Sequence, residues 1–255
     1  MPVWGRPRAC LPIHRLVLAV WLAAWGWAPA AAWGMDLHPR LATGEIIVSC
    51  PEMSEAAAKQ VEVMGMVDAS PEKVWEVITD INYFQNFMPR TLKSRAVTPE
   101  TLQAILKIKP TEAPIAEALL DPVPPHPSLY RVPGQKYDVY LYSLLDFPFP
   151  LCNRWYILKI TNDETQAGGH IYTSSWTMEI GNLRENRGEW RLIPFADGQT
   201  QVTYRLFTDP GGCLPDFLVK QGTKATLPQI ILAVRKRVAQ LSPSQTADSS
   251  QGGNR

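Results

Sequence analysis

The sequence of 255 residues has little of what identifies several common protein classes. Four cysteines are too few for a scaffold built on disulfides. Basic and acidic residues nearly balance, at 25 against 24, so the chain lacks the basic excess typical of nucleic-acid-binding proteins. Beyond the N-terminal region, no segment has 18 uninterrupted apolar residues, the length that predicts a membrane span. We therefore expect neither a cysteine-rich scaffold nor a nucleic-acid partner.

Short motifs of familiar catalytic and cofactor sites are also missing. The chain after residue 32 contains no G-x-S-x-G, H-E-x-x-H, C-x-x-C, G-x-G-x-x-G or P-loop pattern. His38, His126 and His170 are too far apart in sequence for metal-ligand spacing. Glu72 and Glu76 are four residues apart, which suits either acid–base chemistry or a solvated helix face, and we favour the solvated face. We therefore predict no catalytic residue, no metal and no cofactor.

Hydrophobic residues and prolines, by contrast, are plentiful. Hydrophobic residues make up 45% of the chain, which is enough for a sizeable core. The 23 prolines argue against a helical bundle or a coiled coil.

The first 32 residues have the pattern of a secretory signal peptide. Three arginines and no acidic residue accompany an apolar run at 16–27, and Ala30 and Ala32 follow with the A-x-A spacing of a cleavage site. We expect cleavage after Ala32, or else after Ala30. An uncleaved membrane anchor is the alternative, but Gly26 and Pro29 interrupt its apolar run. The protein is therefore expected to be exported, and to be periplasmic or secreted, with a bacterial envelope as the favoured destination.

Three cysteines remain after that cleavage, Cys50, Cys152 and Cys213. An exported protein can form a disulfide, but at least one thiol stays unpaired, and the sequence does not select which. Cys152 and Cys213 have no evident base beside them, so we favour a structural role over a nucleophilic one.

The exported chain divides into a weakly patterned extension, 33–58, and one domain, 59–241. The extension holds a predicted strand at 45–49 and a predicted helix at 54–60. The polar residues 242–255 are expected to form a disordered tail. We expect a monomer.

The first part of the domain combines strands with one helix. Residues 61–69 are rich in β-branched side chains, and Ser70 and Pro71 then suit the cap and the first position of a helix. Apolar residues at helical spacing continue past a break until Pro89. Seven prolines within 110–134 predict a long loop with one helical turn near 116–120, which either shapes the mouth of a cavity or decorates an edge. The predicted strands of this part are 61–69, 92–97 and 102–108.

The second part predicts an antiparallel meander and a long helix. Alternating apolar and polar runs are separated by turn signals such as Asp197-Gly198. A strong turn at 209–212 precedes an amphipathic helix at 214–241, which Pro228 must kink or restart. A curved sheet cannot bury its concave face alone, and this helix is the element long enough to cover it. The predicted strands of the meander are 137–145, 154–161, 170–179, 189–195 and 201–208.

Three stretches of the domain carry a family resemblance. They are VDASPEKVWEVITDINYFQNFMP at 67–89, FPFPLCNRWYILKI at 147–160 and GEWRLIPFADGQTQVTYRLFTDPGGCLPDFLVKQ at 188–221. Together they resemble the START/polyketide-cyclase superfamily, also called SRPBCC. The resemblance implies an α+β helix-grip fold, in which a curved antiparallel β-sheet wraps around a long C-terminal α-helix with a hydrophobic cavity between them. The export signal and the proline-rich insertion depart from the superfamily pattern.

Aromatic side chains on the predicted sheet are the most informative candidates for a ligand site, although each also suits ordinary core packing. Arg154 can meet a ligand headgroup or pair with an acid such as Asp146, and we favour the ion pair. The basic cluster 235–237 suits either membrane docking or a solvated helix face, and we favour the solvated face. The candidate ligand-binding residues are Tyr142, Arg154, Tyr156, Tyr172, Trp176, Trp190, Tyr204, Phe217, Gln221 and Ile231.

The resemblance implies a protein that binds or carries a lipid or other hydrophobic small molecule without a chemical step, and the signal pattern of residues 1–32 adds the expectation that this carrier is exported. Transient membrane contact belongs to this hypothesis. A polyketide cyclase/dehydrase-type enzyme is the first alternative, and it requires an acid–base pair inside the cavity. A ligand-free interaction module, whose cavity its own side chains fill, is the second.

Overall fold

The computed structural model describes four stretches of the chain, without the side chains of Asp197 and residues 216–224. The chain divides into two units, 1–39 and 40–255, and the fold described below is that of the second. The predicted signal peptide, residues 54–59 of the predicted helix at 54–60 and the predicted tail lie outside the described residues, and Gln60, the last residue of that predicted helix, belongs to a strand. The described stretches are 37–49, 60–147, 152–211 and 216–241.

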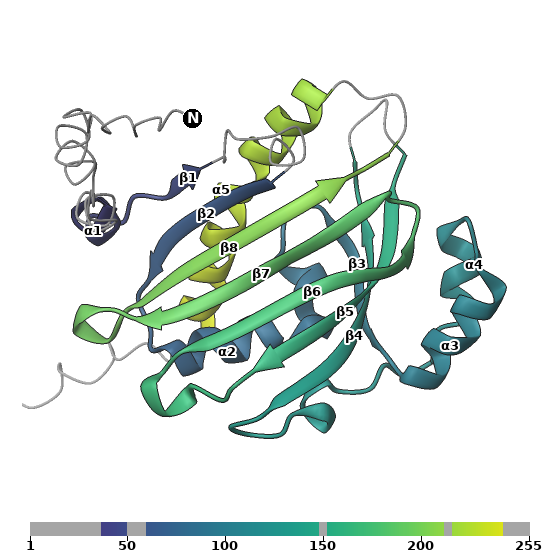
Figure 1. Ribbon diagram of the computed structural model, residues 1–255, viewed down its shortest axis with the longest axis horizontal. Helices are drawn as coiled ribbons and strands as arrows, with labels where there is room; N and C mark the ends of the chain where they lie inside the picture. Colours follow the sequence, from purple (N-terminus) through teal and green to yellow (C-terminus); the bar gives the residue numbers. More distant parts are fainter. Residues whose placement is uncertain (1–36, 50–59, 148–151, 212–215, 242–255) are drawn as a thin grey trace, which may run out of the picture. The chain divides into compact units, whose positions relative to one another are not determined.

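In the described stretches, eight antiparallel strands form one sheet in the order β1-β2-β8-β7-β6-β5-β4-β3 (Figure 1). The predicted meander is confirmed as β4 to β8, with β7 starting four residues earlier than predicted, at Glu185. The strands are β1 Ile47–Ser49, β2 Gln60–Val67, β3 Thr91–Val97, β4 Lys136–Leu145, β5 Arg154–Asp163, β6 Tyr172–Gly181, β7 Glu185–Pro194 and β8 Thr200–Asp209.

Two helical segments cover one face of this sheet, which we call the inner face (Figure 1). The first comprises α2, Pro71–Thr79, and the 3-10 helix η3, Ile81–Asn86, after a break at Asp80. Ser70 occupies the predicted cap position of α2, but its side chain makes no cap hydrogen bond. The second is α5, Asp216–Leu241, which continues through Pro228 as one helix rather than restarting there.

The second half of α5 lies close against β2. A Cβ atom on Gly65 would come within 2.7 Å of Ile231 Cγ2, so only glycine allows this approach. Arg235 Nε donates a hydrogen bond to the carbonyl oxygen of Met66 at 2.6 Å. These contacts fix the helix across the sheet, and the helix-grip architecture predicted from the sequence is confirmed.

The predicted strand at 102–108 is wrong, because these residues belong to a helix, α3, Pro99–Ile108. The Thr98 side chain caps the helix by accepting a hydrogen bond from Thr101 N, and Pro99 suits its first turn. Leu102 and Ile105 are three residues apart and buried, which is helical spacing. The apolar run at 102–108 is short enough for either a strand or a helix, and the Thr98 cap favours the helix.

The proline-rich insertion adds a layer on the opposite face of the sheet, which we call the outer face. Its short helix α4, Ala113–Glu117, overlaps the helical turn predicted near 116–120, and the 3-10 helix η4, Pro127–Tyr130, is a further element that was not predicted. Helices α3 and α4 pack with outward residues of β4 and β5 in a second core cluster. The first part of the insertion, with α4, therefore covers the back of the sheet. Its later part reaches the inner side, where Tyr130 packs against the inner core cluster and Arg131 donates to Glu164.

Candidate functional site

Strand parity sorts the sheet residues onto the two faces. Residues of β4 with odd numbers, such as Tyr137 and Leu141, pack in the inner cluster with α2 and α5. The even-numbered Tyr140 and Tyr142 pack in the outer cluster with α3 and α4. In β5 the even-numbered residues are the inner ones. Tyr156 pairs across the sheet with the odd-numbered Ser143 of β4, and cross-strand partners share a face.

The inner face has a densely filled half beside α2 and the second half of α5. Its side chains are buried and apolar, and the ring of Trp75 stacks on that of Tyr172 with centroids 5.1 Å apart. This half needs no ligand to complete it. The helix residues that close it are Val74, Trp75, Val77, Ile78, Leu227, Ile231, Val234 and Val238.

The other half of the inner face is less completely covered by described side chains, and we call it the open half. Tyr204 is only half-buried, although its strand neighbours Trp190 and Val63 are buried. Leu206, two residues further along β8, is half-buried as well. These positions lie in a central strand, where a filled core would bury them completely. The open half comprises Leu145, Tyr156, Met178, Tyr204 and Leu206, with Phe84, Phe87 and Met88 at the β3 edge.

The phenol groups of the open half lie away from bulk water. Burial raises the pKa of Tyr156 to about 12, although a hydrogen bond with Ser143 opposes this rise. Burial also raises the pKa of Tyr204, and the neighbouring Tyr156 adds to it. Tyr204 therefore combines residual exposed surface with a setting that disfavours the ionised phenol. Both phenols stay protonated at neutral pH and can donate hydrogen bonds.

Aromatic rings line the boundary between the two halves. Tyr204 lies 4.4 Å from Trp190 and 5.3 Å from Trp176, centroid to centroid. Gly188 leaves room for the Trp176 ring, because a Cβ atom there would overlap it. The Trp176 Nε1 donates to Asn186 Oδ1 at 2.9 Å, so the ring is held in place by a buried polar partner. Five predicted ligand residues thus share the inner face: Tyr156, Tyr172, Trp176, Trp190 and Tyr204.

The remaining predicted residues have different positions. Ile231 is fully buried against β2 in the filled half. Phe217 and Gln221 belong to the first half of α5, where side chains lie outside the described residues. Arg154 Nε donates to the carbonyl oxygen of Pro210 at 3.3 Å, and no described contact joins it to Asp146, which instead pairs with Arg90 at 3.9 Å. The expected ion pair with Asp146 is therefore wrong.

Tyr142 is the one predicted ligand residue that the fold places on the outer face. It is fully buried, its ring lies 6.3 Å from that of Trp155, and its hydroxyl donates to Glu117 Oε1 at 2.9 Å. The sheet separates it from the space beside α5. We therefore correct the predicted ligand set by removing Tyr142. Alternation along β4 places Tyr140 and Tyr142 on one face, but only the packing of α3 and α4 shows that this is the outer face.

A buried carboxylate, Glu164, organises the far end of the inner face. Its Oε1 accepts hydrogen bonds from Trp75 Nε1 and Arg131 Nε, both at 2.8 Å, and from the Tyr137 hydroxyl at 3.1 Å. Burial opposes its ionisation, but the hydrogen bonds from Arg131 and Trp75 and the Arg131 charge hold its pKa below the ordinary value. Glu164, which directly follows β5, is thus hydrogen-bonded to Trp75 of α2 and to Arg131 of the insertion.

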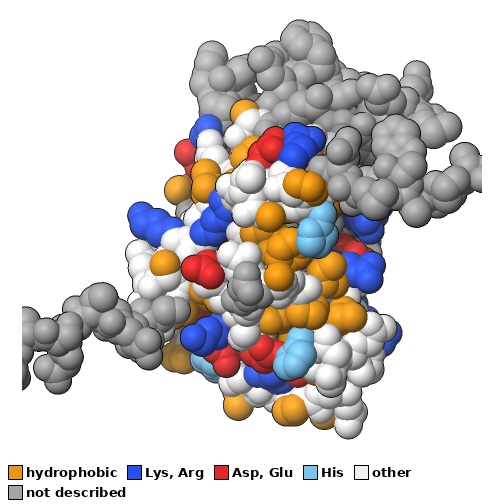
Figure 2. Space-filling view, turned by 90° about the vertical axis from the view of Figure 1, so that its left-hand side faces the viewer, with side chains coloured by type: hydrophobic (Ala, Val, Ile, Leu, Met, Phe, Trp, Pro, Cys, Tyr) orange, Lys and Arg blue, Asp and Glu red, His pale blue; other side chains and the backbone are white. Residues whose placement is uncertain are grey.

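Glu72 has a partner that the sequence did not suggest. Its Oε1 lies 2.5 Å from His170 Nδ1, and the Tyr172 hydroxyl donates to it at 3.3 Å. Burial opposes its ionisation, but the hydrogen bond with His170 lowers the pKa to about 2. The pair lies at the end of the sheet where the β5–β6 turn is, and at that end hydrophobic side chains gather with charged ones around them (Figure 2). Both side chains are substantially exposed, so this is a hydrogen-bonded pair at the surface and not an acid–base centre.

The basic cluster near the end of α5 makes contacts within the domain. Arg235 donates to backbone carbonyl oxygens, and the Arg237 guanidinium lies 4.0 Å from the centroid of the Tyr83 ring. Two of its three cations are therefore engaged in contacts of the fold, which favours a structural role over membrane docking.

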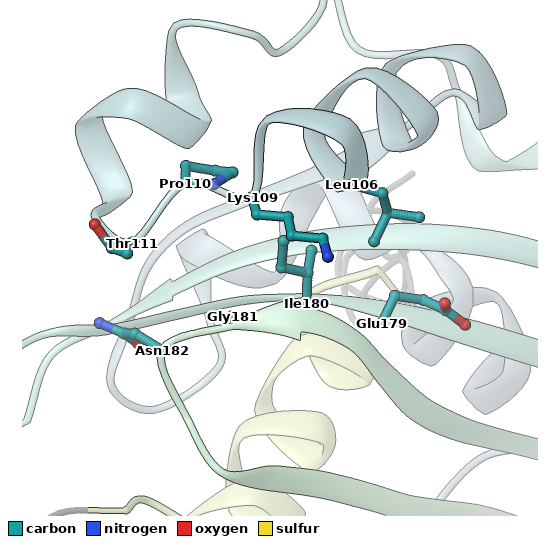
Figure 3. Close-up of a pocket in the computed structure, with 8 residues that line it drawn as sticks. All are labelled: Leu106, Lys109, Pro110, Thr111, Glu179, Ile180, Gly181 and Asn182. Atoms are coloured by element: carbon teal, nitrogen blue, oxygen red, sulfur yellow. The ribbon is translucent and has the colours of Figure 1, made fainter.

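A shallow groove of about 500 Å³ lies on the outer face, between the end of α3 and the end of β6. Figure 3 shows Leu106 and Lys109 on one side and Glu179 and Asn182 on the other. Gly181 is required here, because a Cβ atom would meet the Trp155 carbonyl oxygen at 2.5 Å. The groove is open to solvent and separated from the inner face by the sheet, so the two sites are distinct.

Sequence reasoning missed several side chains of the inner face. Met178 shares the period-two face of Trp176, so parity could have added it. Leu206 follows Tyr204 in the same way. Asn162 and Glu164 gave no signal, because a polar residue near a strand end is usually solvated. Phe84 and Met88 require knowledge of how η3 folds along β3.

Among the described residues, no group of three or more His, Cys, Asp or Glu side chains can hold a metal ion. No described helix is long and apolar enough to cross a membrane. Cys152 is a free, exposed thiol, whereas Cys50 and Cys213 lie outside the described residues.

The family model for polyketide cyclase / dehydrase and lipid transport proteins matches residues 67–235. This match covers well over half of the chain, so the chain belongs to that family, and the predicted membership of the START/polyketide-cyclase superfamily is confirmed.

Individual relatives give the same fold. A STAR-related lipid transfer protein from Xanthomonas axonopodis has a TM-score of 0.52 at 20% identity, over 76% of this chain and 92% of that chain. Human StAR-related lipid transfer protein 5 has a TM-score of 0.51 at 13% identity, over 83% of this chain and 94% of that chain. At these identities the likeness shows the fold alone.

A curated relative matches over a shorter stretch. An uncharacterized protein from Pseudomonas aeruginosa is 34% identical over 88 residues, which are 32% of this chain and 44% of the relative. The chain thus spans less than half the length of that relative.

Proposed function

We propose that this protein binds and carries a hydrophobic, lipid-like molecule against the open half of the inner face. The observation that carries the proposal is the half-buried state of Tyr204 and Leu206 in a central strand, between buried neighbours. Apolar ligand surface buried there contributes about 25 cal/mol per Å² before the cost of ordering the ligand. Family membership supports the proposal, because the family description includes lipid transport.

We further propose that residues 1–32 direct export, so that the carrier acts in a periplasm or outside the cell. The first half of α5 and its neighbouring loops would then open at a membrane surface to exchange the ligand. Both statements rest on the sequence pattern and on the position of this helix segment at the Asp209 end of the sheet.

A cyclase/dehydrase-type enzyme is the second candidate, because the family description names that activity as well. The described inner face offers the buried phenol of Tyr156 with its raised pKa, which can donate a hydrogen bond to a carbonyl group but is a poor base. His126 and His170 are exposed and lie outside this face. A carrier without a chemical step is therefore the better supported function.

Native mass spectrometry of the purified protein, followed by organic extraction, tests the proposal. The expected result is about one apolar molecule per chain on a monomer, released chemically unchanged. An empty protein that also fails to bind 1-anilinonaphthalene-8-sulfonate would overturn the carrier proposal and favour an interaction module with a filled core. Conversion of the extracted molecule on incubation with fresh protein would favour the enzyme.

A further inference from the structure

Tyrosines on the inner face of the sheet differ in what their hydroxyl groups contact. Tyr137 donates a hydrogen bond to Glu164 Oε1 at 3.1 Å, and Tyr172 donates to Glu72 Oε1 at 3.3 Å. Tyr204 is half-buried, and its hydroxyl group has no hydrogen-bond partner among the described residues. Tyr204 therefore has a hydrogen bond to offer that the described chain does not use.

The Tyr204 hydroxyl group also keeps accessible surface. In the described part of the chain, the one side-chain polar atom that is fully enclosed and without a partner is Asn162 Oδ1, so the Tyr204 oxygen is not enclosed in this way. Its neighbour Tyr156 is buried by comparison. A molecule bound against the open half can therefore reach the Tyr204 hydroxyl group.

Two tryptophan rings restrict the position of this phenol. The Tyr204 ring centroid lies 4.4 Å from that of Trp190 and 5.3 Å from that of Trp176. Trp176 is itself held by the hydrogen bond from its Nε1 to Asn186 Oδ1 at 2.9 Å. A side chain that is ordered before the ligand arrives loses less conformational entropy on binding, so this hydroxyl group suits the recognition of a polar group on the ligand.

The chemistry of the phenol and its surroundings selects that polar group. Burial raises the pKa of Tyr204, so the hydroxyl group is protonated at neutral pH and can donate a hydrogen bond. The side chains assigned above to the open half are all uncharged, so an ionised ligand group would be desolvated there without compensation. A neutral acceptor, such as the carbonyl oxygen of a ketone or an ester, meets both conditions.

We propose that the Tyr204 hydroxyl group donates a hydrogen bond to a carbonyl oxygen of the bound ligand, so that the protein selects neutral lipids with a ketone or ester group over pure hydrocarbon chains. This inference rests on the proposed carrier function and adds the class of ligand.

A matched pair of probes tests it on the full chain. Dodecan-2-one and 2-methyldodec-1-ene have similar shapes, but the alkene carries a methylene group in place of the carbonyl oxygen. Displacement of 1-anilinonaphthalene-8-sulfonate reports both affinities, and their ratio is compared between proteins because the cost of removing each probe from water is then the same. In Tyr204→Phe the ratio of ketone affinity to alkene affinity should fall by about three- to tenfold, the value of one neutral hydrogen bond. The affinity for the alkene should stay within about twofold, since the ring is retained.

Tyr137→Phe is the control, because Tyr137 is a buried tyrosine of the same face whose hydroxyl group already donates to Glu164. It should keep the ratio of the unaltered protein. Infrared spectroscopy of bound dodecan-2-one gives a second measurement. The carbonyl stretching band should lie at a lower wavenumber in the unaltered protein than in Tyr204→Phe, because a hydrogen bond weakens the carbonyl double bond.

The outcomes separate the two proposals. The same ratio in the unaltered protein and in Tyr204→Phe would overturn the role of Tyr204, and would indicate a resident water at its hydroxyl group. An equal fall of the ratio in Tyr137→Phe would overturn it as well. Displacement by neither probe from the unaltered protein would instead contradict the carrier function itself.

Discussion

The inner and outer faces of the sheet both carry large aromatic side chains, but the two faces complete their packing differently. On the outer face, Tyr142 and Trp155 are fully buried beneath α3 and α4, and the Tyr142 hydroxyl donates to Glu117. On the inner face, Tyr204 and Leu206 keep accessible surface between buried neighbours. The comparison shows that large aromatic side chains occur on both faces, so aromatic content alone does not identify a ligand site, and the proposed site rests instead on the incomplete cover of the inner face.

The outer cluster gives the largest expected effect. Trp155→Ala should lower the free energy of unfolding by about 3–5 kcal/mol, because it removes a fully buried ring from a closed core. Urea denaturation followed by circular dichroism measures the change. Leu92→Ala, at an exposed position of β3, should stay within about 0.5 kcal/mol. A loss below about 1 kcal/mol in Trp155→Ala would mean that the outer layer is not a core.

The Glu164 network gives an intermediate effect with a defined pH dependence. Glu164→Gln removes the charge that faces Arg131, and should cost about 1–3 kcal/mol at neutral pH, since Arg131 is partly solvated. The folded-state pKa of Glu164 lies below its unfolded value of 4.5, so this stabilisation is complete above pH 4.5 and is lost as the pH falls through the folded pKa.

Denaturation of both proteins between pH 7 and pH 3 checks this prediction. The stability difference between them should narrow on acidification. Asp68→Asn, at an exposed position, is the control and should show no such difference at any pH. If the difference in the free energy of unfolding between the two proteins increased as the pH falls, Glu164 would not be an ionised partner of Arg131.

The hydrogen-bonded pair of Glu72 and His170 gives the smallest expected effect on stability. Glu72→Gln should lower stability by less than about 1 kcal/mol, because both side chains are exposed and solvent screens the pair. The Glu72 pKa of about 2 places the loss of this contribution between pH 4.5 and pH 2. Thermal unfolding should show a decrease in Tm of a few degrees at most. An equal decrease in Glu76→Gln, on the same helix, would show that a general charge effect and not this pair is responsible.

Much of the architecture could be predicted from the sequence, because period-two strands and a long apolar helix stripe are local patterns. The helix at Pro99–Ile108 could not be separated from a strand by its short apolar run, since the deciding contact is the Thr98 cap. The assignment of Tyr142 failed for another reason. Alternation shows which residues share a face, but only the packing of α3 and α4 shows which face is which.

The candidate site was harder to predict than the fold. Tyr156, Tyr172, Trp176, Trp190 and Tyr204 do share the inner face, because alternation places them there. Asn162 and Glu164 depend on tertiary contacts with Tyr137, Trp75 and Arg131, which come from distant parts of the chain.

The central claim is that the ligand occupies the inner face and not the outer groove, and a pair of tryptophan variants tests it directly. Leu206→Trp should fill the space beside Tyr204 and weaken the binding of dodecan-1-ol by about tenfold or more. Ile180→Trp, in the groove of the outer face, should leave the affinity within about twofold. Loss of binding in Ile180→Trp with full binding in Leu206→Trp would contradict the account and place the ligand on the outer face.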